Sequence, residues 1–216
     1  MKAPHNFADE LRRALDDLPR RDTPSVRSIR KRYSILFAKE SSAEVLRFVR
    51  SVLDSASWPE RVVAWEVLAS HAAAFGFLND NLVEEMAQGL SDWGSVDLFG
   101  VTVLGQAWRQ GLVTDSKILE WARSPDRWRR RLALVATVPL NSRARGGSGD
   151  AARTLRVCSL LLGDLDEMVV KAMSWSLREL AKRDPRAVKK FLLKNGEQLP
   201  ARVKRDVLNK LHSQSP

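Results

Sequence analysis

Residues 166–183, DEMVVKAMSWSLRELAKR, carry the pattern that decides the fold. At about 100° of rotation per residue, the apolar side chains of this stretch gather on one face of a helix. They are Val169, Val170, Met173, Leu177, Leu180 and Ala181. Such a face has to be buried against other helices, so the stretch predicts an amphipathic helix packed on a helical core.

Helical periodicity continues from one end of the chain to the other, and no run alternates apolar and polar residues convincingly enough to predict a strand. Thr23-Pro24 and Asp184-Pro185 each place an N-cap residue before a proline at the first helical position. The expected helices span residues 5–18, 24–37, 42–56, 59–76, 80–90, 95–110, 115–124, 126–139, 150–162, 166–183, 185–194 and 200–213. The sequence therefore predicts an all-α protein.

These helices are joined by short connections and form about six pairs, with a spacing close to the roughly 40-residue period of HEAT-type repeats. We therefore expect a HEAT-like helical-repeat solenoid with a basic concave face. It is expected to form a single domain over residues 1–216. Since the sequence repeats are weak, a compact helical bundle is the alternative.

One segment, residues 141–150 (NSRARGGSGD), resembles a linker. Its glycines give flexibility, and Arg143 and Arg145 give positive charge. The segment is either a mobile loop that contacts phosphates through these two arginines or an ordinary solvated connection.

Composition excludes several classes of protein. Hydrophobic residues make up 44% and charged residues 29% of the 216 residues, which is the balance of a soluble globular chain. The single cysteine, Cys158, lies in an apolar run and is expected to fill the core; with only three histidines, neither an internal disulfide nor a Cys/His zinc site is expected. No apolar run approaches the ~20 residues of a membrane span, and the N-terminus lacks a secretory signal, so we expect a cytoplasmic protein, nucleoid-associated in a bacterium.

The charge is unevenly distributed along the chain. The net charge is +10, but residues 1–100 hold 13 basic and 15 acidic side chains, whereas residues 101–216 hold 23 and 11. Positive charge concentrated in one half predicts contact with a polyanion, most commonly nucleic acid. Ribosomal or acidic-protein contacts, or solubility alone, are the alternatives.

Trp175 lies on the face of the 166–183 helix opposite its apolar stripe, beside Lys171, Arg178 and Lys182 at helical spacings. One explanation is that this indole packs against a neighbouring helix pair. The other is an aromatic platform flanked by cations that bind phosphate.

A second feature is the run Asp92-Trp93-Gly94-Ser95-Val96-Asp97. If a helix starts near Ser95, Asp97 lies in its first turn, where a carboxylate caps free N–H groups and complements the helix dipole. The apolar flanks of Asp97 and its closeness to Trp93 favour a catalytic alternative, since burying a carboxylate is otherwise costly.

The third feature is Arg127-Trp128-Arg129-Arg130-Arg131, which distributes four arginines around a helix. It is either a solvated charge run or a group of arginines that bind phosphate bidentately. No P-loop, GxGxxG, GxSxG elbow or metal-ligand cluster accompanies it.

Taken together, these motifs resemble the bacterial DNA alkylation-repair glycosylases built of HEAT-like repeats, the AlkD-like family. The resemblance is carried by W-x-x-V-D at 93–97, by W-x-R-R ending at Arg131, and by A-x-x-W-x-L-R-E at 172–179. The stretches TPSVRSIRK and PERVVAWEVLA are similar to the family as well. Gly94 departs from it, because relatives often carry an acidic residue there, whereas here Asp92 precedes the tryptophan.

The resemblance implies removal of positively charged alkylpurines, such as 3-methyladenine and 7-methylguanine, from duplex DNA by a monomer without a base-flipping pocket, metal or cofactor. It implies that Trp93 and Trp175 contact the deoxyribose with Asp97 between them, and that Arg131 and Arg178 hold phosphates. Relatives without the key residues bind DNA without excision, so a DNA-binding protein for branched or distorted DNA is the alternative. A helical protein scaffold is the third possibility.

The basic groups expected at the DNA are Arg130, Arg131, Lys171, Arg178, Lys182, Arg143 and Arg145. An alkylated purine is already cationic and leaves without a general acid. A single preorganised carboxylate then stabilises the oxocarbenium charge that develops on the sugar.

Overall fold

The computed structural model describes residues 6–20, 22–53 and 57–213, which form helices and no strand. Residue 5 and residues 54–56, at the ends of two expected helices, lie outside this range. The chain divides into two compact units, one up to Gln88 and one from Gly89. The all-α prediction is confirmed, and the single-domain expectation stays a prediction.

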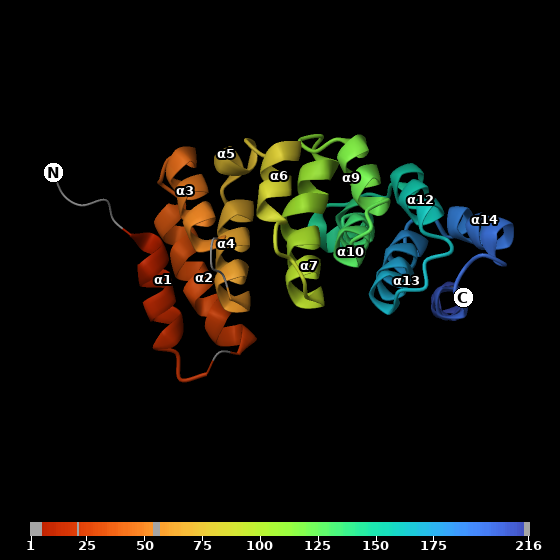
Figure 1. The fold of residues 1–216 in the computed structure, drawn as a ribbon, viewed down its shortest axis with the longest axis horizontal. Coiled ribbons are helices and arrows are strands. Elements are labelled where there is room, and N and C mark those ends of the chain that lie inside the picture. Colours follow the sequence, from red (N-terminus) through yellow and green to blue (C-terminus); the bar gives the residue numbers. More distant parts are fainter. Residues whose placement is uncertain (1–5, 21, 54–56, 214–216) are drawn as a thin grey trace. The chain divides into compact units, whose positions relative to one another are not determined.

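The first unit contains α1 to α6 (Figure 1). Their bounds are α1 Phe7–Asp16, α2 Thr23–Phe37, α3 Ser42–Leu53, α4 Trp58–Ser70, α5 Ala72–Phe75 and α6 Asp80–Met86. Helix α4 packs against α2 and α3, and α1 packs against α3 and α4. The expected helix 59–76 is divided at His71, whose Nδ1 accepts the backbone N–H of Ala74 and so caps α5.

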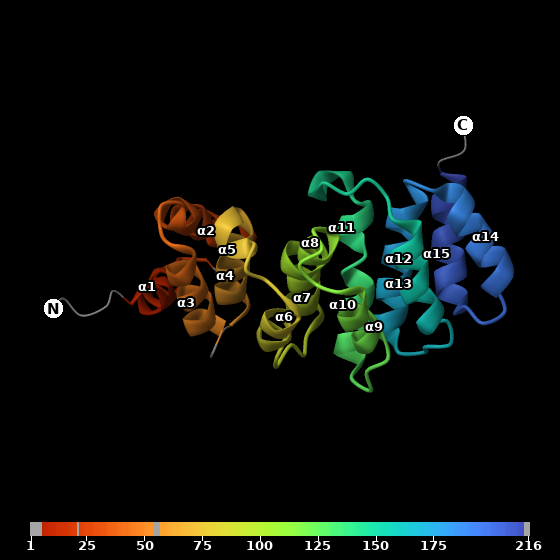
Figure 2. The same ribbon diagram turned by 90° about the horizontal axis from the view of Figure 1, so that it is seen from above.

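The second unit contains the remaining helices (Figure 2). Their bounds are α7 Trp93–Phe99, the π-helix η1 Gly100–Leu104, α8 Gly105–Arg109, α9 Asp115–Ala122, α10 Arg127–Val135, α11 Val138–Asn141, the 3₁₀-helix η2 Arg143–Arg145, α12 Ala151–Leu160, α13 Glu167–Ala181, α14 Pro185–Asn195 and α15 Ala201–His212.

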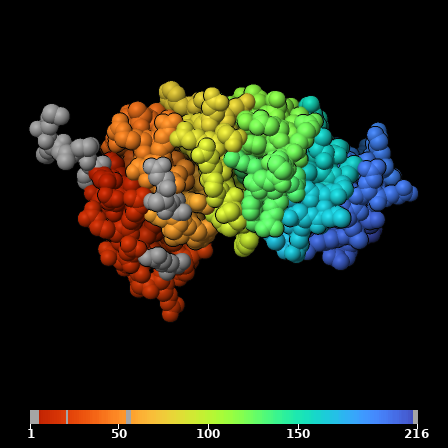
Figure 3. Space-filling view, viewed as in Figure 1, coloured from red at the N-terminus to blue at the C-terminus, as the bar shows by residue number. Residues whose placement is uncertain are grey.

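These helices form two layers within the second unit. In one layer α10 packs against α7 and α13, and α13 packs against α15; in the other, α9 contacts α12. The layers are joined where α9 packs on α10 and where α12 and α14 pack on α13. In the space-filling view, the green-to-blue atoms of this unit form a closely packed surface (Figure 3). This solenoid-like arrangement of helices confirms the expected class, whereas the HEAT subtype and the basic concave face stay predictions.

The core of the second unit follows the periodicity of α13. All six apolar residues expected on its buried face are at most 7% exposed, and Cys158 is fully buried beside them. The Sγ of Cys158 lies 3.7 Å from the Oγ of Ser176 on α13. The amphipathic-helix prediction for residues 166–183 and the core position of Cys158 are therefore confirmed.

The glycine-rich segment 141–150 is a hydrogen-bonded turn rather than an open linker. Buried Asn141 donates to the Oγ1 of Thr154 at 2.9 Å and accepts the N–H of Asp150 at 2.9 Å. Gly147 is required by close packing, because a Cβ there would lie 2.3 Å from the carbonyl oxygen of Pro139. The glycines are therefore explained by the close approach of backbone segments at Gly147 and by the turn conformation, rather than by chain flexibility.

Candidate active site

Helix α7 begins two residues earlier than the sequence suggested, and this changes the interpretation of Asp97. The helix starts at Trp93, and the carboxylate of Asp92 caps it by accepting the N–H of Ser95 at 2.8 Å. The expectation of a helix starting near Ser95 with Asp97 in its first turn is therefore wrong. Since Asp92 performs the capping, capping does not explain a carboxylate at Asp97.

Asp97 is held by Arg131 of α10 in a two-pronged ion pair. The Nε of Arg131 donates to Oδ1 of Asp97 at 2.8 Å, and Nη2 donates to Oδ2 at 2.7 Å. The side chains are 18% exposed for Asp97 and 6% for Arg131. Because both carboxylate oxygens are held by one planar fork, the orientation of the carboxylate is fixed.

Arg131 makes a third contact, in which Nη1 donates to the backbone carbonyl of Met168 in α13. This one guanidinium therefore links α7, α10 and α13. The resemblance implies a phosphate for Arg131, but the structure gives it Asp97 and a carbonyl instead, in a position that is 5% exposed. Its geometry supports a positioning role.

Burial raises the pKa of Asp97 above its ordinary value, and the nearby charge of Asp92 acts in the same direction. The hydrogen bonds and positive charge of Arg131 oppose this rise in the pKa. The site thus contains an oriented carboxylate in poorly hydrated surroundings, where it interacts more strongly with a developing positive charge than it would in bulk water.

The two candidate tryptophans differ in exposure. Trp93 is 63% exposed and precedes Asp97 by four residues, so both lie on one side of α7. Trp175 is partly exposed and follows Met168 by seven residues, which is two turns or roughly 10 Å along α13. Trp93 is therefore available to a ligand beside Asp97. For Trp175, both helix packing and sugar contact stay predictions.

The basic groups of α13 line its partly exposed side. Arg178 is exposed, and its Nε donates to the carbonyl of Ser174 at 3.1 Å. Lys171 pairs with Glu167 at 2.8 Å, and exposed Lys182 pairs with Glu179. The pair of Lys171 and Glu167 is exposed on both sides and contributes little to stability, whereas Glu179 is 13% exposed.

The arginine run of α10 is used largely within the protein. Arg130 donates to the carboxylate of Asp164 at 2.6 Å and to the carbonyls of Ser124 and Pro125 at 3.0 and 2.8 Å. The guanidinium of Arg129 lies 4.7 Å from the centre of the Trp121 ring. For Arg130, as for Arg131, the structure gives internal partners where the sequence suggested phosphates.

Arg143 and Arg145 are exposed on the 3₁₀-turn η2. Nη1 of Arg145 donates to the carbonyl of Val101 in the π-helix at 3.3 Å, and Arg109 donates to the carbonyl of Gly146 at 3.1 Å. The two arginines are thus presented by a structured turn, and contact with DNA stays a prediction for both.

Sequence reasoning missed the carbonyl of Met168 and the capping role of Asp92. A signal for the cap was present, because Asp92 stands three residues before Ser95 at the beginning of an apolar helix. Nothing local marks a carbonyl as an arginine partner. Over the described residues, no three metal-ligating side chains come together, and no helix has the length and apolarity to span a membrane.

Comparison with known families gives one result for most of the chain. The sequence model of the family described as "DNA alkylation repair enzyme" matches residues 22–211. No curated protein matches the sequence. The matched range contains Asp97, Arg131 and both candidate tryptophans.

Proposed function

The chain belongs to the DNA alkylation repair enzyme family, and from this premise we propose that it is a DNA N-glycosylase for cationic alkylated purines in duplex DNA. The observation that carries the proposal is the pair of Asp97 and Arg131, an oriented and partly buried carboxylate beside the exposed ring of Trp93. The proposed substrates are 3-methyladenine and 7-methylguanine.

The reaction follows from the charge of the substrate. Heterolysis of the N-glycosidic bond gives the bonding electron pair to the purine, which neutralises its positive ring, and leaves oxocarbenium character at C1′ of the deoxyribose. The carboxylate of Asp97 stabilises that charge and orients the water that adds to C1′. The water loses its proton to Asp97 or to solvent, and an abasic site remains.

Arg131 acts in this scheme through Asp97. Its fork holds the carboxylate ionised and aimed, while Nη1 donates one hydrogen bond to the carbonyl of Met168. Trp93 and Trp175 pack against the deoxyribose, where aromatic faces add favourable interaction as positive charge develops.

Duplex DNA is bound by the exposed cations, through phosphates. Arg178, Arg143 and Arg145 are the first contacts, and Lys171 and Lys182 join when phosphates replace their glutamate partners. Arg130 and Arg131 are left out of this set because their side chains are only 20% and 6% exposed and form ion pairs inside the unit. The proposed enzyme works as a monomer.

The test compares Asp97→Asn with Asp164→Asn. Both remove a carboxylate that pairs with an arginine of α10, and Asp164 is similarly shielded, at 11% exposed. Release of 7-methylguanine and 3-methyladenine from methylated duplex DNA is measured under single-turnover conditions. We expect the Asp97 variant to lose about a hundredfold or more, while the Asp164 variant stays within about twofold of the wild type.

The outcomes separate the candidates. Equal release by Asp97→Asn and wild type would remove Asp97 from the reaction. If even the wild type releases no base but binds duplex DNA tightly, with an affinity that falls steeply with salt, the chain is the DNA-binding protein of the alternative.

A further inference from the structure

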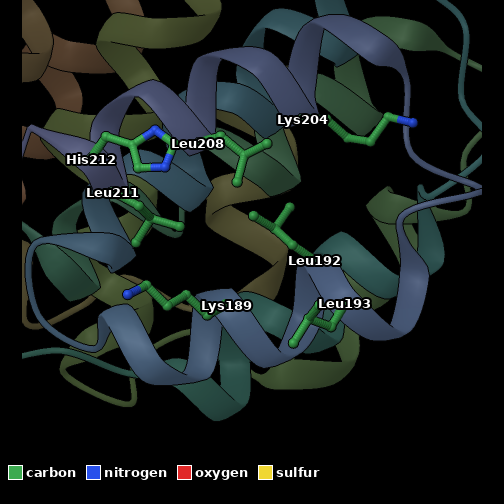
Figure 4. Close-up of a pocket in the computed structure, with 7 residues that line it drawn as sticks. All are labelled: Lys189, Leu192, Leu193, Lys204, Leu208, Leu211 and His212. Atoms are coloured by element: carbon green, nitrogen blue, oxygen red, sulfur yellow. The ribbon is translucent and has the colours of Figure 1, made fainter.

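Helices α14 and α15 form an apolar groove between them, of about 400 Å³. Leu192 and Leu193 come from α14, and Leu208 and Leu211 come from α15; Leu192 and Leu208 point toward one another across the opening (Figure 4). Leu193 is 87% exposed and Leu208 is 43% exposed. Large apolar side chains gathered at one exposed place mark a site of interaction.

The groove lies where another layer of helices would pack. On one side α15 packs against α13, as α13 packs against α10 and α10 against α7. On the other side Leu211 is buried at 4% exposure, but among the described residues no helix covers Leu193 and Leu208. Since each layer of a helical array buries its apolar face against the next, this face has the form that receives a helix.

The ends of the groove are positively charged. Lys189 and His212 stand at one end and Lys204 at the other (Figure 4), and no carboxylate lines the space between them. A second hollow of about 530 Å³ shares Leu193 and Lys204 and continues over the turn between the two helices, where Glu197 and Lys194 also line it. The site is thus an elongated trough rather than a closed cavity, and it suits an extended rod better than a compact ligand.

We propose that this trough docks an amphipathic helix of a partner protein, with leucine-like side chains in the groove and acidic residues toward the lysines. The apolar stripe of such a helix would fill the space between Leu192 and Leu208, which is the helix-in-groove mode of recognition. Its carboxylates would meet Lys189 and Lys204 at the two ends. A second copy of this chain, docked through the same face, would set lysines against lysines.

The probe is a fluorescein-labelled helical peptide of roughly 14 residues, about 21 Å long. It carries leucines at every third or fourth position and glutamates elsewhere, and its binding is followed by anisotropy with the full chain. A scrambled peptide of the same composition controls for attraction to the net charge of +10. A second control peptide replaces the glutamates with lysines.

Two substitutions in the groove, Leu193→Glu and Leu208→Glu, are compared with Leu165→Glu. Leu165 is 85% exposed on the turn before α13, so it matches Leu193 in exposure but lies outside the groove. All three positions are exposed, and we expect the variants to fold as the wild type does. Each groove variant should weaken peptide binding about tenfold or more, and Leu165→Glu should leave it unchanged.

The proposal is overturned by three results. One is that the scrambled or lysine-containing peptide binds as well as the acidic helix, or that none binds. Another is that duplex DNA displaces the peptide while Leu193→Glu weakens DNA binding, since the groove would then belong to the DNA site. The third is a dimer in sedimentation that Leu193→Glu dissolves, which would assign the face to a second copy of the chain.

Discussion

Replacing Arg131 with lysine distinguishes a residue that positions Asp97 from one that binds phosphate. Lysine keeps the positive charge but offers one ammonium where arginine offers a planar fork. In the structure the guanidinium makes two hydrogen bonds to Asp97 and one to the carbonyl of Met168. An ammonium on a shorter stem cannot reproduce all three bonds in the same geometry.

The expected cost follows from those contacts. Hydrogen bonds to charged groups contribute about 1.5–3 kcal/mol each, and losing one or two of them destabilises the fold by roughly 2–4 kcal/mol. Arg130→Lys is the matched substitution on the same helix. The Arg130 side chain also forms three hydrogen bonds but is 20% exposed, against 6% for Arg131, so water replaces part of them and we expect a smaller loss, of about 1–2 kcal/mol. Urea unfolding of both variants measures the difference.

The functional assay combines base release with DNA binding. We expect Arg131→Lys to slow the release of 7-methylguanine from bound DNA by about tenfold or more, because Asp97 is no longer held at both oxygens. The affinity for duplex DNA and its dependence on salt should stay as in the wild type. The reasoning is refuted if affinity falls and the salt slope becomes shallower by about one, while release from bound DNA is unchanged.

Three further predictions concern other parts of the unit. Burial raises the pKa of Cys158 to about 12, so the thiol should resist Ellman's reagent in the native protein at about pH 8 and react on unfolding; reaction without unfolding would contradict its packing. Gly147→Ala should destabilise the fold by a few kcal/mol, because the new Cβ would lie 2.3 Å from the carbonyl oxygen of Pro139. Gly163→Ala is the control: no atom lies within 4 Å of its Cβ, so stability should change by less than about 0.5 kcal/mol. Equal melting temperatures of the two variants would refute the prediction. Burial raises the pKa of Asp97, so its ionised carboxylate lowers native stability at pH values above that pKa, and this loss disappears as the pH falls toward the pKa of Asp97 in the unfolded chain. Base release needs the ionised carboxylate and should decline over the same pH window. A release rate unchanged from about pH 8 to 4 would contradict the assignment.

The helices could be predicted from local signals because those signals act within one turn. Asp184-Pro185 and the apolar face of α13 correctly locate their helices. The sequence pattern predicts the start of α7 near Ser95, whereas the helix begins at Trp93, capped by Asp92. The π-helix that follows α7 left no mark in the sequence, because a change of hydrogen-bond register keeps the same apolar pattern.

The site could be predicted only as a set of candidates. Asp97 and Arg131 are 34 residues apart, and nothing in the spacing of the sequence says that these two side chains meet. The run of arginines suggested phosphate binding, but the partners of Arg130 come from the turn before α10 and the turn before α13. Tertiary structure therefore decides which arginines are left for a ligand.

The link from Asp97 through Arg131 to Met168 makes the carboxylate dependent on three successive helices of one layer. Helical arrays come apart most easily at their ends, and a molecule that loses α13 also loses one of the anchors of Arg131. In the proposed glycosylase, Arg131 would then hold Asp97 less rigidly while α7 and α10 were still folded. Partly unfolded molecules would therefore be unable to excise bases, and they would produce no abasic sites in DNA.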